Sequence, residues 1–325
     1  MNDEEILKEE DFLDEEKKDR TWIKKLLIGF GVFLVLVGCL LFYSRFCATT
    51  GLNVKEYKVV DSSIPKYFHG LKVVHFSDLH YGRTVHQKEL DSLVSKINEL
   101  RPDLVVFTGD LVDDDTKLTN DEVKDIAASL NKIETKIGKY VIMGNHDYKI
   151  KQWSTIIKNS GFINLNDTYD LIYDDGYEPI MLAGISTNLL GTKNIKDKSV
   201  PIFDYFKEVN KKNDETKQDL ANESEEISNV DKSIYEILLI HEPDFIEDID
   251  YKKFDLILAG HSHNGQVRLL GIGAIIKPVG AETYYNEYYS LGNTDLYVSS
   301  GIGVSRVNFR LFNRPSINFY RIVNH

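Results

Sequence analysis

Three stretches decide the fold: LKVVHFSDLH at 71–80, DLVVFTGD at 103–110 and KYVIMGNHD at 139–147. Each contains a short apolar run rich in Val, Ile, Leu or Phe, which is typical of strands buried on both faces. Helical patterns at 86–100 and 119–137 separate the runs, with apolar residues three and four positions apart. Strands and helices in this alternation predict an α/β fold with a parallel sheet and crossover helices.

Two more apolar runs, 236–240 and 255–260, extend the strand pattern toward the C-terminus. The last third then changes character, because no helical pattern of comparable strength follows. Short strands are expected there at 266–270, 281–290, 295–299, 307–312 and 316–322. Strands spaced this closely favour antiparallel pairing.

A polar motif follows each of the five apolar runs, and together the motifs supply carboxylates, imidazoles and one amide. The carboxyl ends of strands in α/β sheets are where ligands collect, so loops far apart in sequence can meet there. One Asp after a strand is usually a turn residue and one His usually packs, but five motifs at five strand ends indicate a common site. The candidate residues are Asp78, His80, Asp110, Asn145, His146, Asp147, His241, His261 and His263.

These donors are oxygen and nitrogen atoms of the kind that suits Mn²⁺, Fe or Zn²⁺. A glycine precedes Asp110, Asn145 and His261, and we expect it to let the backbone turn sharply out of the strand. The remaining histidines have no partner motif and are expected to be structural: His69, His75, His86 and His325.

Composition narrows the class of protein. The 325 residues include 39 Lys and Arg against 51 Asp and Glu, a net charge of −12, which argues against a generic nucleic-acid binder. The hydrophobic fraction of 42% is enough for a full core. The two cysteines, Cys39 and Cys47, lie outside the expected globular part, so neither a disulfide framework nor a cysteine-based zinc site is expected there.

The N-terminal region predicts a membrane anchor. After a polar tail at 1–25, residues 26–44 contain no charged side chain. At about 1.5 Å per residue this stretch extends about 28 Å, close to the thickness of a bilayer's hydrocarbon core. Three alternatives remain open: a buried core helix, a cleaved signal peptide, and a lipoprotein box, LVGC at 36–39, with the lipid on Cys39.

Charge asymmetry predicts the orientation of the anchor. Five cations lie before the span and three after it: Lys17, Lys18, Arg20, Lys24 and Lys25, then Arg45, Lys55 and Lys58. This favours a single-pass protein of the cell membrane with its N-terminus in the cytoplasm and its main domain outside. A linker at 45–55 leads to a domain at 56–325, within which the polar segment 207–233 is expected to be a surface insert or mobile loop.

In the order D-x-H, G-D, G-N-H-D, H, G-H-x-H, the sequence resembles the calcineurin-like metallophosphoesterase superfamily from about residue 54 to 323. The strings GHSHNGQVRL at 260–269 and GIGVSRVNFRLFNRP at 301–315 resemble its bacterial membrane-associated subgroup. That subgroup usually has a second Gly where this chain has Asn264, so the edge of the substrate pocket is expected to differ. The resemblance implies a four-layer αββα sandwich with two metal ions between the sheets.

The resemblance also implies a role for each candidate residue. Asp78, His80 and His263 would hold one metal, Asn145, His241 and His261 the other, and Asp110 would bridge them. His146 would face the substrate, oriented by Asp147, and stabilise or protonate the leaving oxygen. A hydroxide bridging the two cations would attack the phosphorus atom, which agrees with how paired metals activate water and clamp phosphoryl oxygens.

Other dinuclear hydrolases fit less well. A metallo-β-lactamase requires an H-x-H-x-D-H run, whereas Asn264 follows His263, and amidohydrolase barrels open with H-x-H rather than D-x-H. A non-catalytic anchored binding domain on the same fold is the alternative function. The substrate stays open between a monoester, a diester and a pyrophosphate, and the anchor favours a lipid or cell-envelope phosphate.

Overall fold

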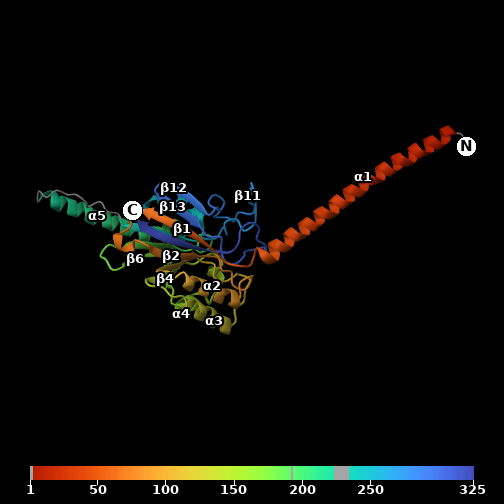
Figure 1. Ribbon diagram of the computed structural model, residues 1–325. Helices are drawn as coiled ribbons and strands as arrows, with labels where there is room; N and C mark the ends of the chain where they lie inside the picture. The colour runs from red at the N-terminus through yellow and green to blue at the C-terminus, as the bar shows by residue number, and fades with distance from the viewer. Residues whose placement is uncertain (1–2, 192, 223–233) are drawn as a thin grey trace. The chain divides into compact units, whose positions relative to one another are not determined.

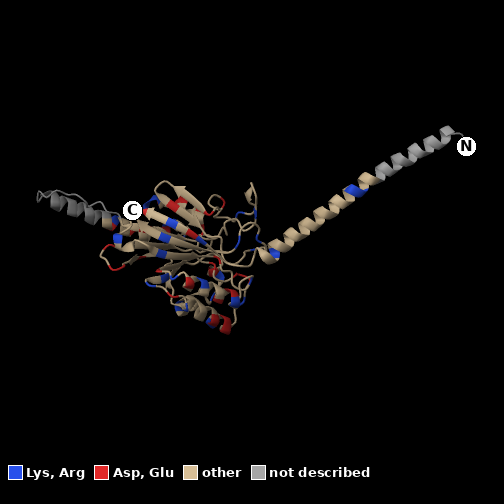
Figure 2. Cartoon of the chain, in the orientation of Figure 1, with Lys and Arg blue, Asp and Glu red and all other residues tan. Residues whose placement is uncertain are grey.

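The computed structural model describes residues 3–191, 193–222 and 234–325, which divide into two compact units, Met1–Cys47 and Ala48–His325. The first unit is one long helix, α1 (Asp3–Phe42), followed by a π-helical turn, η1 (Tyr43–Cys47). Within its segment Thr21–Cys47, an 18-residue stretch has a mean hydropathy of 2.7 with none of its residues buried, and the basic residues of the segment, Lys24, Lys25 and Arg45, lie only near its two ends (Figure 2). Taken by itself, this helix has exposed apolar side chains all round it, which is typical of a helix that packs against lipid.

The second unit contains two six-stranded sheets (Figure 1). The first has the order β1 (Asn53–Asp61), β14 (Ser316–Asn324), β2 (Leu71–Phe76), β3 (Leu104–Phe107), β4 (Gly138–Val141) and β5 (Ile163–Asn164). The second has the order β12 (Tyr288–Leu291), β13 (Thr294–Val298), β9 (Leu256–Ala259), β8 (Tyr235–Ile240), β7 (Ile180–Ile185) and β6 (Thr168–Ile172). A small hairpin, β10 (Arg268–Leu269) and β11 (Gly273–Ala274), stands outside both sheets.

The sheets pack face to face with helices outside them. Alternate residues of β2 point to opposite faces of the first sheet: Val73 packs against the second sheet, and Val74 packs against the helices. Both faces of the sheet are therefore covered. The helices on the first sheet are α2 (Gln87–Glu99), α3 (Asn120–Asn131) and α4 (Trp153–Ser160), which lie together in Figure 1. Ile195 and Ile202 of α5 (Ile195–Asn222) cover the second sheet, together with the 3₁₀ turn η4 (Pro243–Asp248). The predicted four-layer α/β architecture is therefore confirmed.

The C-terminal third is only partly antiparallel. β12 pairs antiparallel with β13, as predicted, but β13 runs parallel to β9, and β14 runs parallel to β1. The strand expected at 307–312 is absent from the described structure, where Leu311 makes one isolated bridge to Val267. Positive φ angles at Arg306 and Phe312 break the extended backbone there.

Two boundaries also differ from expectation. β1 begins at Asn53, inside the predicted linker 45–55. The polar segment expected to be a loop is helical as far as Asn222, where α5 ends, and residues 223–233 lie outside the described residues. Glu, Lys, Gln, Ala and Leu all have high helix propensity, so a polar composition does not prevent a helix.

Candidate metal centre

The candidate residues come together because they follow strands of both sheets at one edge of the unit. β2, β3 and β4 of the first sheet end just before Asp78, Asp110 and Asn145. β8 and β9 of the second sheet end just before His241 and His261. The site is thus assembled between the two sheets from loops up to 185 positions apart, counted from Asp78 to His263.

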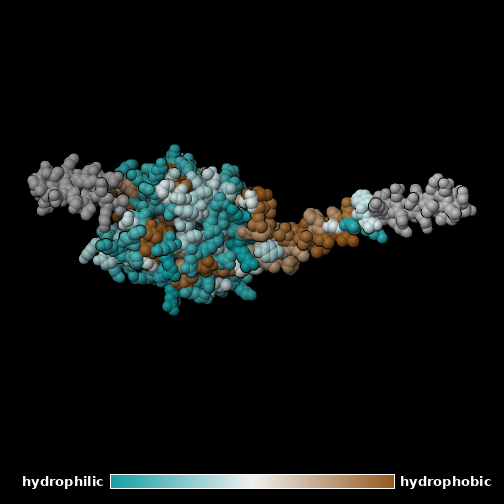
Figure 3. All heavy atoms as spheres, turned by 45° about the horizontal axis from the view of Figure 1, so that its top comes forward, coloured by the Kyte–Doolittle hydropathy of each residue, from teal (hydrophilic) through white to brown (hydrophobic). Residues whose placement is uncertain are grey.

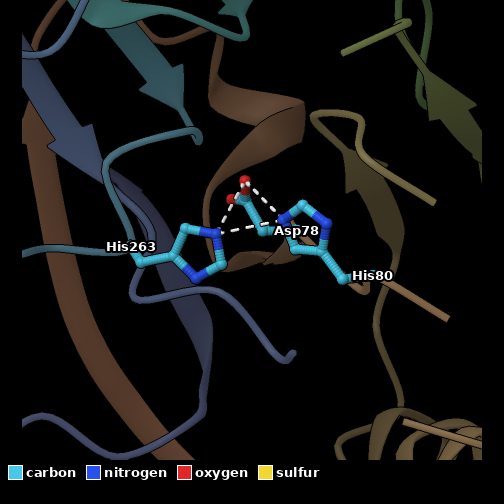
Figure 4. Close-up of side chains that lie close together, drawn as sticks. All are labelled: Asp78, His80 and His263. Carbon is cyan, nitrogen blue, oxygen red and sulfur yellow. Dashed lines mark hydrogen bonds and ion pairs between the residues drawn. The ribbon is translucent and has the colours of Figure 1, made fainter. Parts of the chain in front are cut away.

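One cluster consists of Asp78, His80 and His263, which are all buried (Figure 4). The Nε2 atoms of the two imidazoles are 3.1 Å apart. Asp78 Oδ1 lies 3.5 Å from His263 Nε2 and 4.0 Å from His80 Nε2. Two nitrogens and one oxygen therefore point at a common position, as the dashed lines of Figure 4 indicate.

A second cluster consists of Asp110, His241 and His261. His241 Nε2 lies 3.3 Å from Asp110 Oδ2 and 3.2 Å from the side-chain oxygen of Asn145. Asn145 therefore joins this cluster, with its amide oxygen directed at the same imidazole nitrogen as the carboxylate.

Asp110 faces both clusters with the same atom. Its Oδ2 is 3.6 Å from His80 Nε2 and 3.3 Å from His241 Nε2. Its other oxygen, Oδ1, accepts a hydrogen bond from the His146 backbone amide at 2.8 Å, which fixes the carboxylate plane. Oδ2 is the atom that a bridging carboxylate would need.

Hydrogen bonds on the far sides of the rings determine which nitrogens face the site. His241 donates from Nδ1 to the Thr108 carbonyl at 2.6 Å, and His261 donates from Nε2 to the Val279 carbonyl at 2.9 Å. In a neutral imidazole the other nitrogen then carries the lone pair. His241 therefore offers Nε2 and His261 offers Nδ1.

The protonation states of most donors suit cation binding. His241 is the exception: although burial opposes it, the Asp110 carboxylate raises the pKa of this imidazole well above its usual value, so a bound cation would have to displace a proton from Nε2. Burial lowers the pKa of His80 to about 3 and lowers the pKa values of His261 and His263, so these rings are neutral near pH 7. Burial raises the pKa of Asp78 to about 6, because a buried carboxylate lacks solvent to stabilise its charge. A cation would supply that stabilisation, so the residues present fit divalent metal ions.

The backbone is strained where the donors are attached. Five candidate ligands have positive φ angles although none is glycine: Asp78, His80, Asp110, His261 and His263. Each such conformation costs of order 1 kcal/mol or more and persists only where the surrounding structure enforces it. Asn264 also has a positive φ, of 49°, so it adopts the conformation for which glycine would be the natural choice.

The glycines before the donors act in two ways. Gly109 has a φ of 96° and turns the chain, as expected. Gly144 and Gly260 are required for space instead, since a Cβ would lie 2.3 Å from Asp110 Oδ1 and 2.1 Å from Ser77 Oγ respectively. At Gly144 and Gly260, therefore, glycine is needed because neighbouring loops pack closely against it, and not because the backbone turns sharply there as expected.

A pocket opens over the clusters. Its floor includes Asp110, Asn145 and His146, and its rim includes Ser305 and Arg306. One wall is apolar and consists of Val267, Ile276, Pro278 and Val307. A ligand with a polar head and an apolar part would match both sides of this pocket.

The sequence matches a family of known proteins. Residues 71–265 match the family model described as calcineurin-like phosphoesterase. The chain belongs to the calcineurin-like phosphoesterases. The uncharacterized metallophosphoesterase YkuE of Bacillus subtilis (strain 168) is 29% identical over 284 residues, covering 86% of this chain and 88% of that protein.

Two other relatives add to this comparison. A metallophosphoesterase of Campylobacter jejuni is 29% identical over 301 residues, which is 91% of this chain and 70% of the relative. A transmembrane protein with metallophosphoesterase domain from Danio rerio is 25% identical over 292 residues, which is 87% of this chain and 60% of that protein. The expected superfamily is confirmed, and this calcineurin-like phosphoesterase is a metal-dependent phosphoric ester hydrolase with one N-terminal helix that is long and apolar enough to cross a membrane.

His146 lies at the pocket floor of the phosphoesterase, with Nε2 4.0 Å from Asp110 Oδ2. The Asp114 amide donates a hydrogen bond to His146 Nδ1 at 3.2 Å, and Asp114 Oδ1 is 3.3 Å from the same nitrogen. An acceptor at Nδ1 places the proton of the neutral ring on Nε2, which faces the clusters.

Asp147 does not orient His146, contrary to what the resemblance implies. In the described structure its buried carboxylate accepts hydrogen bonds from three backbone amides: Asp110 at 2.7 Å, Leu111 at 2.8 Å and Gly144 at 3.0 Å. It thereby joins the loops after β3 and β4. The residue beside His146 Nδ1 is Asp114 instead.

Sequence reasoning missed three supporting residues besides Asp114, namely Asp113, Arg83 and Arg310. Asp113 is buried, lies 3.7 Å from His80 Nδ1 and is held by Arg83 Nε at 2.8 Å. Arg310 is fully buried beneath His263 and donates to the carbonyls of Gly301 and Gly303. The run Asp113–Asp115 after the Gly-Asp motif was the available signal for Asp113, whereas Arg310 lies in the string 301–315 that resembles the bacterial subgroup, to which no residue role was assigned.

Proposed function

We propose that the protein is a membrane-anchored phosphoesterase that uses two divalent metal ions. Asp78, His80 and His263 would hold one ion, and Asn145, His241 and His261 the second, with Asp110 bridging them. The observation that carries this assignment is the position of Asp110 Oδ2, 3.6 Å from His80 Nε2 in one cluster and 3.3 Å from His241 Nε2 in the other.

When bound, such ions act as Lewis acids on the phosphoryl oxygens and lower the pKa of the attacking water. The chain supplies the geometry and the proton. Asp110 separates the two donor sets, and the buried shell of loops excludes bulk water from them. In its imidazolium form, His146 would give the Nε2 proton to the leaving oxygen and be left neutral, and the Asp114 carboxylate 3.3 Å from Nδ1 would stabilise the positive charge of the ring before the transfer.

The substrate class that we propose is a lipid or cell-envelope phosphate. The apolar wall of the pocket and the candidate span Thr21–Cys47 support it. The excess of cations before the span supports a cytoplasmic N-terminus with the phosphoesterase unit on the outer side of the cell membrane. Mn²⁺, Fe and Zn²⁺ all suit the oxygen and nitrogen donors.

Metal content and hydrolysis, measured on the same full-length samples, test the proposal. Asp110→Asn is expected to lose both ions and the hydrolysis of a soluble phosphodiester, because one atom serves both clusters. Asp115→Asn is the matched control, since the Asp115 side chain is 86% exposed and should leave both readouts unchanged.

Chelation of the wild-type protein should abolish hydrolysis, and Mn²⁺ should restore it. Full activity in a dialysed, metal-free sample would overturn the dinuclear mechanism. A parallel comparison of a phosphomonoester, a phosphodiester and a lipid-linked pyrophosphate would then identify the substrate class.

A further inference from the structure

The β10–β11 hairpin is the most hydrophobic exposed part of the unit Ala48–His325. Six exposed or half-exposed side chains make up what we call the apolar rim: Leu269, Leu270, Ile272, Ile275, Ile276 and Val279. Leu270 is 78% exposed and Ile272 is 73% exposed. Elsewhere in the described part of this unit, Ile163 is the one other Leu or Ile in the exposed class.

The hairpin stands out from the sheets in Figure 1, and hydrophobic surface gathers on that side of the unit in Figure 3. Its base is held firmly. Arg268 donates to the Asn264 carbonyl at 2.9 Å and to the Asn286 side chain at 2.8 Å, while Gln266 donates to the carbonyls of Val307 and Phe309. The apolar tip is therefore presented by a fixed support, and an exposed apolar surface of this kind marks an interaction site.

Charge around the rim is also unusual for this acidic chain. Neither 256–281, which contains the hairpin, nor 296–325, which flanks it, contains a single Asp or Glu. The exposed cations in these segments include Lys277, Arg306 and Arg314. Apolar side chains with Lys277 among them, and with Arg306 lining the same pocket as Ile276, match the interface of a bilayer that carries anionic headgroups.

The start of the unit lies at the same edge as the metal centre. β1 runs parallel to β14, and β14 runs antiparallel to β2, so β1 begins where β2 ends. Asn53 pairs with Ser316, whose amide donates to the Gly301 carbonyl. Five residues, 48–52, lie between the candidate span and β1, so at about 3.3 Å per residue the chain keeps Asn53 within about 20 Å of Cys47.

We propose that the apolar rim docks into the membrane interface and delivers the pocket mouth to the lipid surface. Ile276 belongs both to the rim and to the apolar wall of the pocket, so the two surfaces are continuous. Val279 extends the link, since its carbonyl accepts the hydrogen bond from His261. A lipid phosphate could then pass from the bilayer to the donor clusters along apolar side chains. This inference rests on the proposed membrane anchoring and is independent of the proposed hydrolysis.

Fluorescence of the full-length chain in vesicles tests the docking. With Cys39 and Cys47 replaced by Ala, single cysteines at Leu270→Cys and Ile272→Cys are labelled with an environment-sensitive nitrobenzoxadiazole dye. Tyr177→Cys is the matched control, because Tyr177 is 98% exposed and lies in the β6–β7 turn at the opposite ends of the strands. The vesicles contain phosphatidylcholine and phosphatidylglycerol, with and without lipid carrying a doxyl quencher near the headgroup.

Dye at positions 270 and 272 should shift its emission to the blue and be quenched about two-fold or more, whereas dye at 177 should do neither, since interfacial segments bury their apolar face about 5–10 Å deep. Equal behaviour at all three positions would overturn docking. A blue shift without doxyl quenching would overturn it too, because a protein partner or a second copy would then cover the rim. Failure of the chain to float with the vesicles would overturn the anchoring and the docking together.

Hydrolysis of a soluble phosphodiester is measured on the same samples to keep the two proposals apart. Quenching without hydrolysis supports docking and contradicts the proposed chemistry. Hydrolysis without quenching overturns docking and leaves the chemistry standing.

Discussion

Replacing Asp147 with Asn should destabilise the phosphoesterase unit rather than disable its chemistry directly. The carboxylate is fully buried and accepts three backbone hydrogen bonds, two at Oδ2 and one at Oδ1. An Asn side chain has one oxygen, so in its best orientation it keeps the amides of Asp110 and Gly144 and leaves the Leu111 amide facing an NH₂ group.

The magnitude follows from two opposing effects. A buried amide left without an acceptor costs about 1–3 kcal/mol, and the two remaining bonds lose the assistance of the negative charge. Burial, together with the nearby Asp110 charge, raises the pKa of Asp147 to about 7, so removing its charge also relieves a cost. We expect a net loss of about 1–3 kcal/mol in the free energy of unfolding, which lowers Tm by about 3–10 °C for a unit of this size.

Thermal unfolding of the full-length chain in detergent, followed by Trp fluorescence, measures this loss. Trp153 lies buried in α4 and reports on the unit. Asp114→Asn is the matched control, because the Asp114 side chain contacts His146 and Lys149 but no backbone amide among its described hydrogen bonds. It should shift stability by less than about 0.5 kcal/mol and lower turnover instead. Asp147→Asn with unchanged Tm and lost activity would refute this reasoning.

Three further outcomes are expected. His146→Ala should keep both metals in elemental analysis but lose about 10²–10⁴ in turnover. If this variant contained no metal, His146 would be a metal ligand and its assignment as the proton donor would be wrong. Burial and a hydrogen bond with Asp255 raise the pKa of Glu236 to about 9, so the folded state keeps a proton that the unfolded state releases, and stability falls as pH rises from about 4.5 toward 9. Glu236→Gln should therefore raise Tm more at pH 8 than at pH 5, and an equal shift at both would contradict the assignment. In a Cys39→Ala, Cys47→Ala background, Tyr177→Cys should react with an impermeant maleimide on intact cells, whereas reaction only after lysis would reverse the proposed orientation.

The parts of the fold that local sequence specifies were predictable. Apolar runs in the sequence predicted the strands β2, β3, β4, β8 and β9. The polar residues that follow these runs predicted the edge of the two sheets at which the donors meet. Thr119 and Glu122 form the capping box that begins α3, close to where the helical pattern begins. The donor clusters were accessible to sequence reasoning because each ligand lies within four residues of the end of its strand.

The parts of the fold that depend on contacts between distant residues were not predictable from the sequence. β1 carries Lys55, Glu56 and Lys58 in place of an apolar run, and it is a strand because β14 pairs with it along its whole length. α3 ends at Asn131 rather than near 137, and the Lys139 amine bonds the carbonyls of Leu130 and Asn131. The roles of Asp114, Asp147 and Arg310 likewise follow from tertiary approach and not from spacing in the sequence.

The pairing of β1 with β14 has a mechanical consequence. Any pull between the N-terminal helix and the phosphoesterase unit must pass through residues 48–52 into β1, which nine residue pairs join to β14, from Asn53↔Ser316 to Asp61↔Asn324. Tension along a strand loads its ladder of hydrogen bonds together, so they must fail in concert instead of opening one by one. Lys55 adds a cross-link, with Nζ bonded to Glu287 and to Ser300 beside the second sheet. β1, the strand that bears the load, is thus bonded both to the first sheet and to residues beside the second sheet. A pull on the N-terminal helix is therefore resisted by the whole phosphoesterase unit rather than by β1 alone.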